Sequence, residues 1–527
     1  MHMRVAHARA RWYALQMRPL HIVAAAWVLS CGGANPAPVA PTTTSAATTT
    51  DPGTTPAEPA APEEPRLPLW SAVKKGVLPN GVTYYVMRHE QPRQRAALWL
   101  AVDAGSLQED DDQQGLAHFV EHMAFNGTRS YPKQAIIDYL EKVGMEFGPD
   151  VNAFTSFDET VYQLQVPTDD PEFVTKGLDI LHEWAGGISF DKVEVDKERG
   201  VVLEEWRLGR GPWRRVFDKQ APVLFAGTRY AKRLPIGQPD VIKNAPRETL
   251  RRYYEDWYRP TMMAVIVVGD VDPDAVVQQI RSRFEDLRAP HRVRPRITAE
   301  PLQVKGTQVS IETDPELPRT SVAIHNLFPH RPERTKSSFR EKMIDRLYHE
   351  MLNQRLGELR RRPTAPFVWA GSSTGDMTRQ FEAFSRSATA KDGQAEATLE
   401  TLLVEVTRVE RHGFTPTELE RARLAVLTDA NQSAAEADKE ESYSYASEMT
   451  RNFFEGEFMI GRQAEADLWN ELVPGITLDE VNAAARTWGD SDARVILISG
   501  PTGAPLPTKA RVLELAAAID QKQLEPW

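Results

Sequence analysis

The order of strand-like and helix-like segments in this chain runs through once and then begins again. From about residue 67, strand-like segments precede a series of long helices, and the apolar strand 262–268 follows near the end of the unit. After an Arg- and Pro-rich stretch at 285–302, strands and then long helices recur. This repetition predicts two homologous α+β domains, each a mostly antiparallel sheet packed against several helices.

The boundaries follow from hydrophobic periodicity and turn residues. In the first unit, strands are expected at 83–87, 96–102 and 262–268, a β-prone stretch at 151–166, and helices at 113–125, 132–143, 171–186, 191–209, 246–257 and 272–284. In the second unit, strands are expected at 308–311, 321–324, 366–374, 380–388 and 495–499, and helices at 336–358, 393–411, 416–435 and 477–487, with more helix to about 452. We therefore place a first domain at 67–290 and a second at 300–527.

The segment His118-Phe-Val-Glu-His122 carries the strongest chemical signal. Residues four apart lie one turn apart on the same face of a helix, so His118 and His122 can bind one metal ion. Glu121 lies at the edge of that face, where a carboxylate can exchange protons with a water at the metal. The order H-x-x-E-H is the inverzincin signature. The alternative is a chance grouping on a solvated helix.

A catalytic zinc ion usually takes three protein ligands and leaves one position open. The helix expected at 191–209 supplies candidates for the third ligand. Glu198 and Glu205 are seven residues apart and share one face. One of the two can bind the metal while the other orients a ligand histidine. Without the histidine motif, an acidic solvated helix would be the better interpretation.

Four segments resemble the insulinase/pitrilysin family of zinc peptidases, and the likeness is greatest to bacterial periplasmic pitrilysin-like peptidases. They occur in the family's order and cover residues 70 to about 290. They are Gly115-Leu-Ala-His-Phe-Val-Glu-His-Met-Ala-Phe-Asn-Gly-Thr128, Asn152-Ala-Phe-Thr-Ser-Phe-Asp-Glu-Thr-Val-Tyr162, Glu198-Arg-Gly-Val-Val-Leu-Glu-Glu205, and Trp257-Tyr-Arg-Pro-Thr-Met-Met with Val267-Val-Gly-Asp270.

The resemblance implies one Zn²⁺ per chain. It makes His118, His122 and Glu205 the ligands, Glu198 the carboxylate that orients a histidine, and Glu121 the general base. Spacing from the histidines favours Glu198 as the ligand instead, whereas the local pattern E-R-x-V-V-x-x-E favours Glu205. We expect Glu205 on the strength of that pattern.

The β-prone stretch after the motif is expected to bind substrate. An edge strand can pair with an extended peptide through main-chain hydrogen bonds, and Asn152, Ala153 and Phe154 are the candidates. An ordinary strand within the sheet is the alternative, and Phe154 could equally be buried. Phe119 and Phe125 flank the metal helix, where core packing is the more probable role than a side-chain pocket.

The second unit lacks an H-x-x-E-H segment and resembles the family's non-catalytic repeat. Family members often supply an Arg and a Tyr from another domain. The corresponding stretch here contains Arg355, and Phe367 stands at the position expected for the tyrosine. Longer family members have four repeats, so a separate second-half subunit, a homodimer or an open half working alone are all compatible with the sequence.

The N-terminal 66 residues are expected to lie outside the fold. Residues 1–31 resemble a signal peptide with a lipobox, Val28-Leu-Ser-Cys31, in which Cys31 would be lipidated; a plain signal peptide is the alternative. Residues 32–66, rich in Ala, Pro and Thr, are expected to form a disordered tether. This predicts an exported bacterial protein, in the periplasm or as an outer-membrane lipoprotein, that meets a membrane only through its anchor.

Composition excludes little else. The net charge of −11 argues against nucleic-acid binding, which needs a basic face. The leading hypothesis is a zinc endopeptidase acting on short or unfolded peptides. The alternatives are a peptide-binding subunit of a two-chain peptidase with little activity alone, and a surface lipoprotein with a merely structural zinc.

Overall fold

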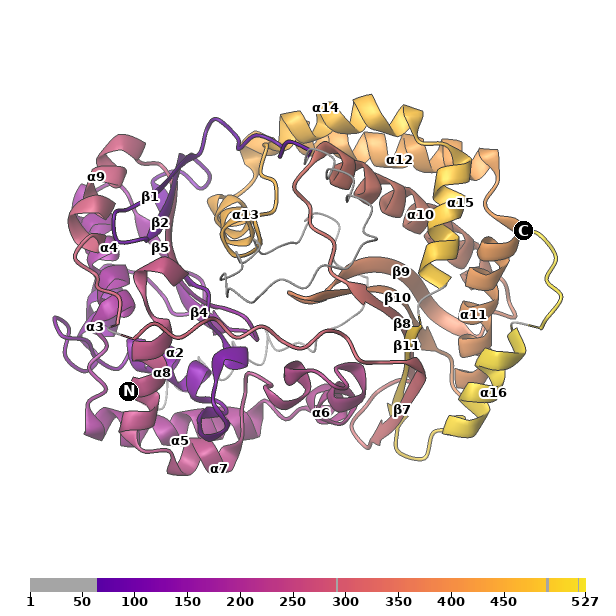
Figure 1. The fold of residues 1–527 in the computed structure, drawn as a ribbon, viewed down its shortest axis with the longest axis horizontal. Helices are drawn as coiled ribbons and strands as arrows, with labels where there is room; N and C mark the ends of the chain where they lie inside the picture. Colours follow the sequence, from indigo (N-terminus) through magenta and orange to yellow (C-terminus); the bar gives the residue numbers. More distant parts are fainter. Residues whose placement is uncertain (1–63, 291, 490–491, 520) are drawn as a thin grey trace, which may run out of the picture.

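The computed structural model describes residues 64–290, 292–489, 492–519 and 521–527 (Figure 1). The expected signal peptide, Cys31 and nearly all of the expected tether lie outside these residues. Near the end of that tether, Glu64 accepts a hydrogen bond from the backbone N–H of Ser337 at 3.1 Å, and Arg66 forms an isolated β-bridge with Thr335, both in the second half of the chain. No helix in the described part is long and apolar enough to cross a bilayer.

The first half contains a six-stranded sheet in the order β1-β2-β6-β3-β5-β4. Strands β2 and β6 are parallel, and the other neighbours are antiparallel. The strands are β1 (Lys74–Val77), β2 (Thr83–Arg88), β3 (Arg95–Val102), β4 (Val151–Thr155), β5 (Thr160–Pro167) and β6 (Met263–Gly269).

The second half contains a five-stranded sheet in the order β7-β11-β8-β10-β9, with β7 and β11 parallel and the other neighbours antiparallel. Its strands are β7 (Gly306–Asp314), β8 (Ser321–Pro329), β9 (Phe367–Thr378), β10 (Phe381–Ala390) and β11 (Ala493–Pro501). Apart from the additional edge strand β1, the two sheets have the same strand order and the same directions. The predicted fold class of two homologous α+β domains is therefore confirmed.

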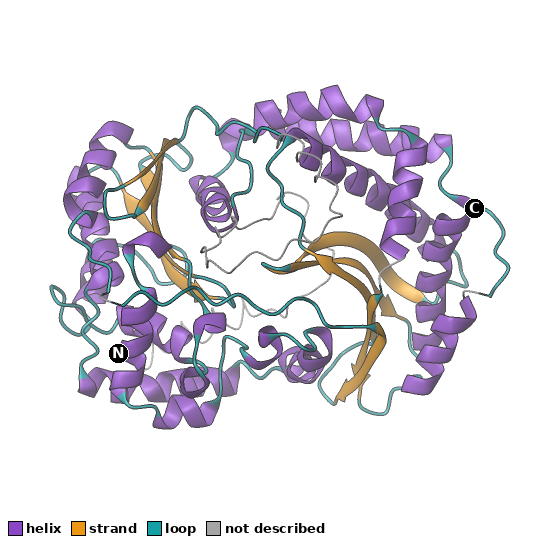
Figure 2. Cartoon of the chain, viewed as in Figure 1, coloured by secondary structure: helices purple, strands orange, loops and turns teal. Residues whose placement is uncertain are grey.

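Helices fill the connections between corresponding strands in both halves (Figure 2). In the first half they are α2 (Leu116–Ala124), α3 (Ala135–Lys142), α4 (Pro171–Gly186), α5 (Lys192–Leu208), α6 (Pro212–Leu224), α7 (Pro239–Asn244), α8 (Arg247–Trp257) and α9 (Pro273–Phe284). In the second half they are α10 (Lys336–Arg360), α11 (Ala395–His412), α12 (Pro416–Ala435), α13 (Ser442–Glu455), α14 (Arg462–Leu472), α15 (Leu478–Gly489) and α16 (Lys509–Ile519). Sequence analysis did not anticipate β1, α6, α7, α14 or α16.

Each sheet packs one face against helices of its own half. In the first half this core joins strand residues such as Leu98 and Val265 to Phe119 of α2 and Trp184 of α4. In the second half, residues from β8, β10 and β11 pack against α10, α11 and α15. Burial of apolar surface is the main force that holds such layers together.

The opposite face of each sheet is covered by a helix from the other half. Tyr445 and Met449 of α13 pack on Trp99 and Ile266 of the first sheet. Helix α6 does the reverse, and its residues Ala221 and Leu224 lie in a cluster with apolar residues of β10 and β11. This reciprocal exchange joins the two halves along both sheets (Figure 1).

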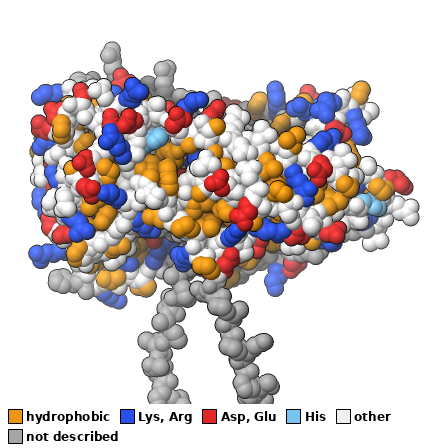
Figure 3. Space-filling view, turned by 90° about the horizontal axis from the view of Figure 1, so that it is seen from above, with side chains coloured by type: hydrophobic (Ala, Val, Ile, Leu, Met, Phe, Trp, Pro, Cys, Tyr) orange, Lys and Arg blue, Asp and Glu red, His pale blue; other side chains and the backbone are white. Residues whose placement is uncertain are grey.

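Charged side chains of both signs are interspersed on the face seen from above (Figure 3). Hydrophobic side chains lie among them without a continuous basic patch in that view.

Candidate metal centre

Helix α2 carries the H-x-x-E-H segment, and all nine of its residues are buried. The helix begins after Gly115, whose φ of 98° is a left-handed conformation that favours glycine. The Oε1 atom of the buried Glu109 carboxyl group accepts hydrogen bonds from the backbone N–H groups of Gly115 and Ala117, both at 2.9 Å. Glu109 therefore satisfies donors that a helix N-terminus leaves without intrahelical partners.

The structure brings His118, His122 and Glu205 together. The Nε2 atoms of the two histidines are 3.2 Å apart. Glu205 on α5 places Oε2 at 3.2 Å from His122 Nε2 and Oε1 at 3.6 Å from His118 Nε2. One candidate ligand atom from each residue lies within 4.8 Å of the others. No comparable group of three His, Cys, Asp or Glu side chains occurs elsewhere in the described part of the chain.

Glu198 lies one step further out. Its Oε1 atom accepts a hydrogen bond from His122 Nδ1 at 2.7 Å, which directs Nε2 of the same ring toward His118 and Glu205. Glu198 and Glu205 thus touch different atoms of one imidazole, although they stand on the same face of α5. A carboxylate on the far nitrogen of a metal-binding histidine fixes its tautomer and its orientation.

The two histidines have opposite pKa shifts. Burial lowers the pKa of His118. Burial also acts to lower the pKa of His122, but the hydrogen bonds and charges of Glu198 and Glu205 outweigh it and raise that pKa to about 10. The two carboxylates therefore favour positive charge on the His122 ring, whereas burial disfavours it on the His118 ring.

The donor set fits zinc. Two imidazole nitrogens and one carboxylate oxygen are a usual ligand set of catalytic zinc sites, and they leave a position open. The three side chains are buried at 4–8% exposure on two packed helices, so little reorganisation is needed to bind an ion.

The side chain of Glu121 contacts a residue that sequence analysis did not identify. The hydroxyl of Thr155, at the end of β4, donates a hydrogen bond to Glu121 Oε2 at 2.8 Å. A strand alternates its side chains between two faces, so Val151, Ala153 and Thr155 share the face turned toward α2. That alternation, together with the motif, was the signal available in the sequence.

The three predicted substrate residues lie on β4, an edge strand of the sheet that pairs with β5. Ala153 is buried in the core beside α2, whereas Phe154 packs on the opposite face, against the cluster that includes α13. Asn152 is half-buried, and its Oδ1 accepts a hydrogen bond from the N–H of Ala153 at 2.8 Å.

A small pocket opens beside this strand. It is lined by Glu121, His122, Phe125, Phe147, Val151, Asn152 and Ala153. Phe125 stands both in this lining and in the buried core, whereas Phe119 is wholly buried in the core.

The two second-half residues singled out in the sequence are buried within that half. The guanidinium of Arg355 on α10 donates from Nε and Nη2 to the carboxylate of Glu418 on α12, at 2.6 and 2.9 Å. Phe367 at the start of β9 is buried in the second core.

Family profiles match both halves. Residues 84–219 match the profile described as "Insulinase (Peptidase family M16)", and residues 244–426 match "Peptidase M16 inactive domain". The chain is 34% identical over 456 residues to the Zinc protease PQQL-like of Arabidopsis thaliana, covering 86% of this chain and 45% of that protein. It is 33% identical over 376 residues to the Probable zinc protease PqqL of Escherichia coli K12, covering 71% and 40%. The chain thus spans somewhat less than half the length of these curated relatives.

A solved structure agrees. The crystal structure of the first half of the periplasmic protease PqqL from Escherichia coli superposes with a TM-score of 0.82 at 28% identity, covering 88% of this chain and 99% of that chain. Pitrilysin, at 16% identity and a TM-score of 0.65, shares the fold. The chain belongs to the insulinase family of peptidases, peptidase family M16.

Proposed function

We propose that this chain is a zinc-dependent endopeptidase that hydrolyses peptide bonds of short or unfolded peptides. The observation that carries the proposal is the buried cluster of His118, His122 and Glu205 with Glu121 beside it. The names of the relatives, which are zinc proteases, support the same activity. A purely structural zinc would not need a carboxylate such as Glu121 next to an open coordination position.

In this proposal His118, His122 and Glu205 hold the zinc ion, and Glu198 orients His122 through Nδ1. Zinc supplies Lewis acidity there, which makes a water more acidic and polarises a substrate carbonyl. Glu121 takes a proton from the water whose oxygen bonds to the carbonyl carbon, and it gives that proton to the amine that leaves when the C–N bond breaks.

Strand β4 is proposed to hold the substrate. Its edge can pair with an extended peptide through main-chain hydrogen bonds of Asn152, Ala153 and Phe154, which makes little demand on substrate sequence. The small pocket bounded by Phe125 and Phe147 adjoins the same strand and can receive one apolar side chain.

Location and assembly belong to the same proposal. We infer an exported bacterial protein that is periplasmic or held at the outer membrane through a lipid on Cys31, because one relative is described as a periplasmic protease. The chain spans less than half the length of its curated relatives. We propose peptide substrates as its partners, and a homodimer or a separate second-half subunit as its assembly.

The test is cleavage of a quenched-fluorescence peptide library by the purified chain. Chelation should abolish cleavage and added zinc should restore it. Absence of cleavage by a zinc-loaded wild-type chain would contradict the proposal and favour a peptide-binding subunit.

The ligand assignment has a matched control on one helix. Glu205→Gln should weaken zinc binding strongly, and Glu198→Gln by about 10–100-fold because it acts through His122. Glu204→Gln should leave zinc affinity unchanged, because Glu204 is exposed and pairs with Arg207. Wild-type zinc affinity in Glu205→Gln would reject Glu205 as a ligand.

A further inference from the structure

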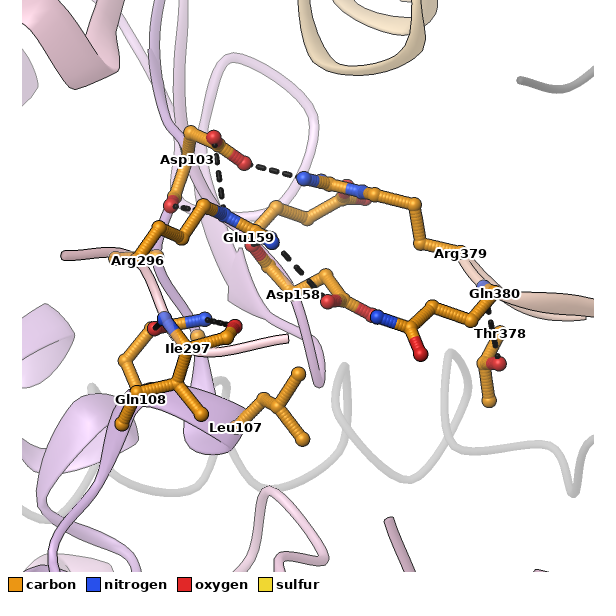
Figure 4. Close-up of polar contacts among 12 residues, drawn as sticks. Asp103, Leu107, Gln108, Asp158, Glu159, Arg296, Ile297, Thr378, Arg379 and Gln380 are labelled. Atoms are coloured by element: carbon orange, nitrogen blue, oxygen red, sulfur yellow. Dashed lines mark hydrogen bonds and ion pairs between the residues drawn. The ribbon is translucent and has the colours of Figure 1, made fainter. Parts of the chain in front are cut away.

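Arg379 crosses from the second half into the first, close to the candidate active site. It lies in the tight turn between β9 and β10, and Figure 1 shows that hairpin extending toward β4. Its side chain is only 9% exposed. The guanidinium binds Asp103 at the end of β3 and donates to Glu159 Oε2 at 2.9 Å (Figure 4).

Acidic groups surround this arginine. Asp158 neighbours Glu159 in the first half, and Glu455 of α13 lies 3.9 Å from Arg379 Nε. A second arginine, Arg296, binds Asp103 at 3.0 Å and Asp158 at 3.2 Å. Two guanidinium groups therefore bridge four carboxylates, and Arg379 is the one that the β9–β10 hairpin supplies.

Glu159 belongs to the turn between β4 and β5. The N–H of Ser156 donates to the carbonyl of Glu159 at 2.8 Å, which closes the turn. Thr155 and Thr160, on either side of it, form the first pair of the β4–β5 ladder. Thr155 is the residue whose hydroxyl donates to Glu121 Oε2. The contact with Arg379 is thus one residue away from the strand pair that presents Thr155 to Glu121.

The same turn has little freedom on its other side. The N–H groups of Ser106 and Leu107 donate to its carbonyls. A Cβ atom placed on Gly105 would lie 2.4 Å from the carbonyl oxygen of Ser156, so the turn packs directly on the glycine backbone. These contacts come from the first half itself. The β9–β10 hairpin adds the guanidinium of Arg379, which opposes the burial that raises the pKa of Glu159 to about 7.

We propose that Arg379 is a positioning residue through which the second half fixes the β4–β5 turn and, by way of Thr155, the Glu121 carboxylate. This rests on the proposed peptidase function and deepens it. It gives the half without a metal cluster a defined part in catalysis within one chain.

The experiment compares Arg379→Ala and Arg379→Lys with a control at the same interface, Arg215→Ala. Arg215 on α6 donates to both carboxylate oxygens of Asp314 on β7 at 2.6 Å, so it also joins the halves. Its other partners are Glu316, just after β7, and the carbonyl of Arg210, so none of its contacts involves the β4–β5 turn. All variants are made in the full chain and checked for zinc content.

We expect Arg379→Ala to lower kcat about 10–100-fold with zinc content retained, because small displacements of catalytic groups have effects of this size. Arg379→Lys keeps the positive charge but replaces the planar guanidinium with a single ammonium group, so it should show a smaller loss. Arg215→Ala should stay within about twofold of wild type. If Arg379→Ala does not fold, the comparison of Arg379→Lys with Arg215→Ala decides.

Two further readouts separate positioning from general destabilisation. Hydrogen–deuterium exchange should speed up in residues 151–160 in Arg379→Ala and not in Arg215→Ala. On kcat, Arg379→Ala should add little to Thr155→Val, because both act on the same hydrogen bond, and Thr155→Ser, which keeps the hydroxyl, should lose less activity than Thr155→Val.

Unchanged exchange in residues 151–160, or fully additive losses with Thr155→Val, would overturn the positioning role. The exchange measurement needs no turnover. An inactive wild type would therefore defeat the proposed function while exchange still decides whether Arg379 holds the turn.

Discussion

The two halves share one topology and use the corresponding helix pair for different chemistry. Helix α2 lies between β3 and β4, and α10 lies between β8 and β9. Likewise, α5 is the second helix after β5, and α12 is the second helix after β10. Where α2 and α5 present two histidines and two glutamates, α10 and α12 present the buried Arg355–Glu418 ion pair. The same fold thus supports a candidate metal centre in the first half and a buried ion pair in the second half.

The histidines of α2 and the histidine of α10 also differ in what their ring nitrogens contact. His118 and His122 direct Nε2 atoms toward each other and toward Glu205. His349 of α10 instead contacts the hydroxyls of Ser372 and Thr374 through its two ring nitrogens, at 3.0 and 2.7 Å. Burial lowers its pKa to about 3, so it is neutral and its ring nitrogens are engaged by neutral groups.

The largest expected effect is on zinc binding, when these histidines are replaced by alanine one at a time. His118→Ala should remove stable zinc binding and reduce cleavage to background, because two ligands rarely hold catalytic zinc. His349→Ala should leave the zinc content at the wild-type level and affect stability only. Metal analysis after dialysis checks both, and equal zinc loss in the two variants would break the distinction between the halves.

The next effect concerns the ion pair of the second half. Arg355→Met leaves the Glu418 carboxylate buried without a cation, although still hydrogen-bonded to Thr415, which should lower the free energy of unfolding by about 3–5 kcal/mol. Zinc affinity should not change, because the pair belongs to α10 and α12. Denaturant unfolding together with a zinc titration measures both quantities; a change in zinc affinity would show that the second half controls the metal centre directly.

A third difference lies at the start of the two helices. Burial raises the pKa of Glu109, which caps α2, from 4.5 to about 8. The folded chain therefore keeps a proton that the unfolded chain releases. The stability that Glu109 contributes is complete below pH 4.5 and is lost as the pH rises through about 8.

Glu109→Gln removes this titration. Within that pH range the unfolding free energy of wild type should fall relative to the variant, by up to ~1.4 kcal/mol per pH unit. Denaturant midpoints at several pH values measure the difference. Parallel pH profiles for the two proteins would show that Glu109 does not titrate there.

The smallest effect is at the start of α10. Its N-cap is a neutral capping box in which Thr335 accepts from the N–H of Ser338. Thr335→Ala should cost about 1 kcal/mol of unfolding free energy, with no change in zinc content. The loss should not depend on pH between about pH 6 and 8, because Glu64, whose pKa is lowered by hydrogen bonds from Ser337 and Thr335, stays ionised there. A pH-dependent loss would remove the contrast with Glu109.

Much of this molecule was predictable because its local patterns are strong. The four-residue spacing brings His118 and His122 onto one face only if the segment is helical, and α2 contains both residues. The shared face of Glu198 and Glu205 followed from helical geometry, but periodicity cannot say which nitrogen each carboxylate meets. That depends on how α5 crosses α2, which is set by packing between elements distant in sequence.

The contacts between the halves were not predictable in the same way. Helix α6 contains Pro222 and several charged residues, so its short apolar face gives a weak signal, and its packing partner is the other sheet. Arg379 meets Asp103 across 276 positions of the chain. From the sequence alone, a single arginine in a turn is expected to be solvent-exposed, because the carboxylates that surround it come from distant segments.

The central claim is that the first half binds zinc while Glu121 moves the proton. Glu121→Gln tests it most directly, by measuring zinc content and peptide cleavage on the same preparation. The account predicts one zinc ion per chain, as in wild type, with cleavage lost. Cleavage at the wild-type rate by the zinc-loaded variant would contradict it.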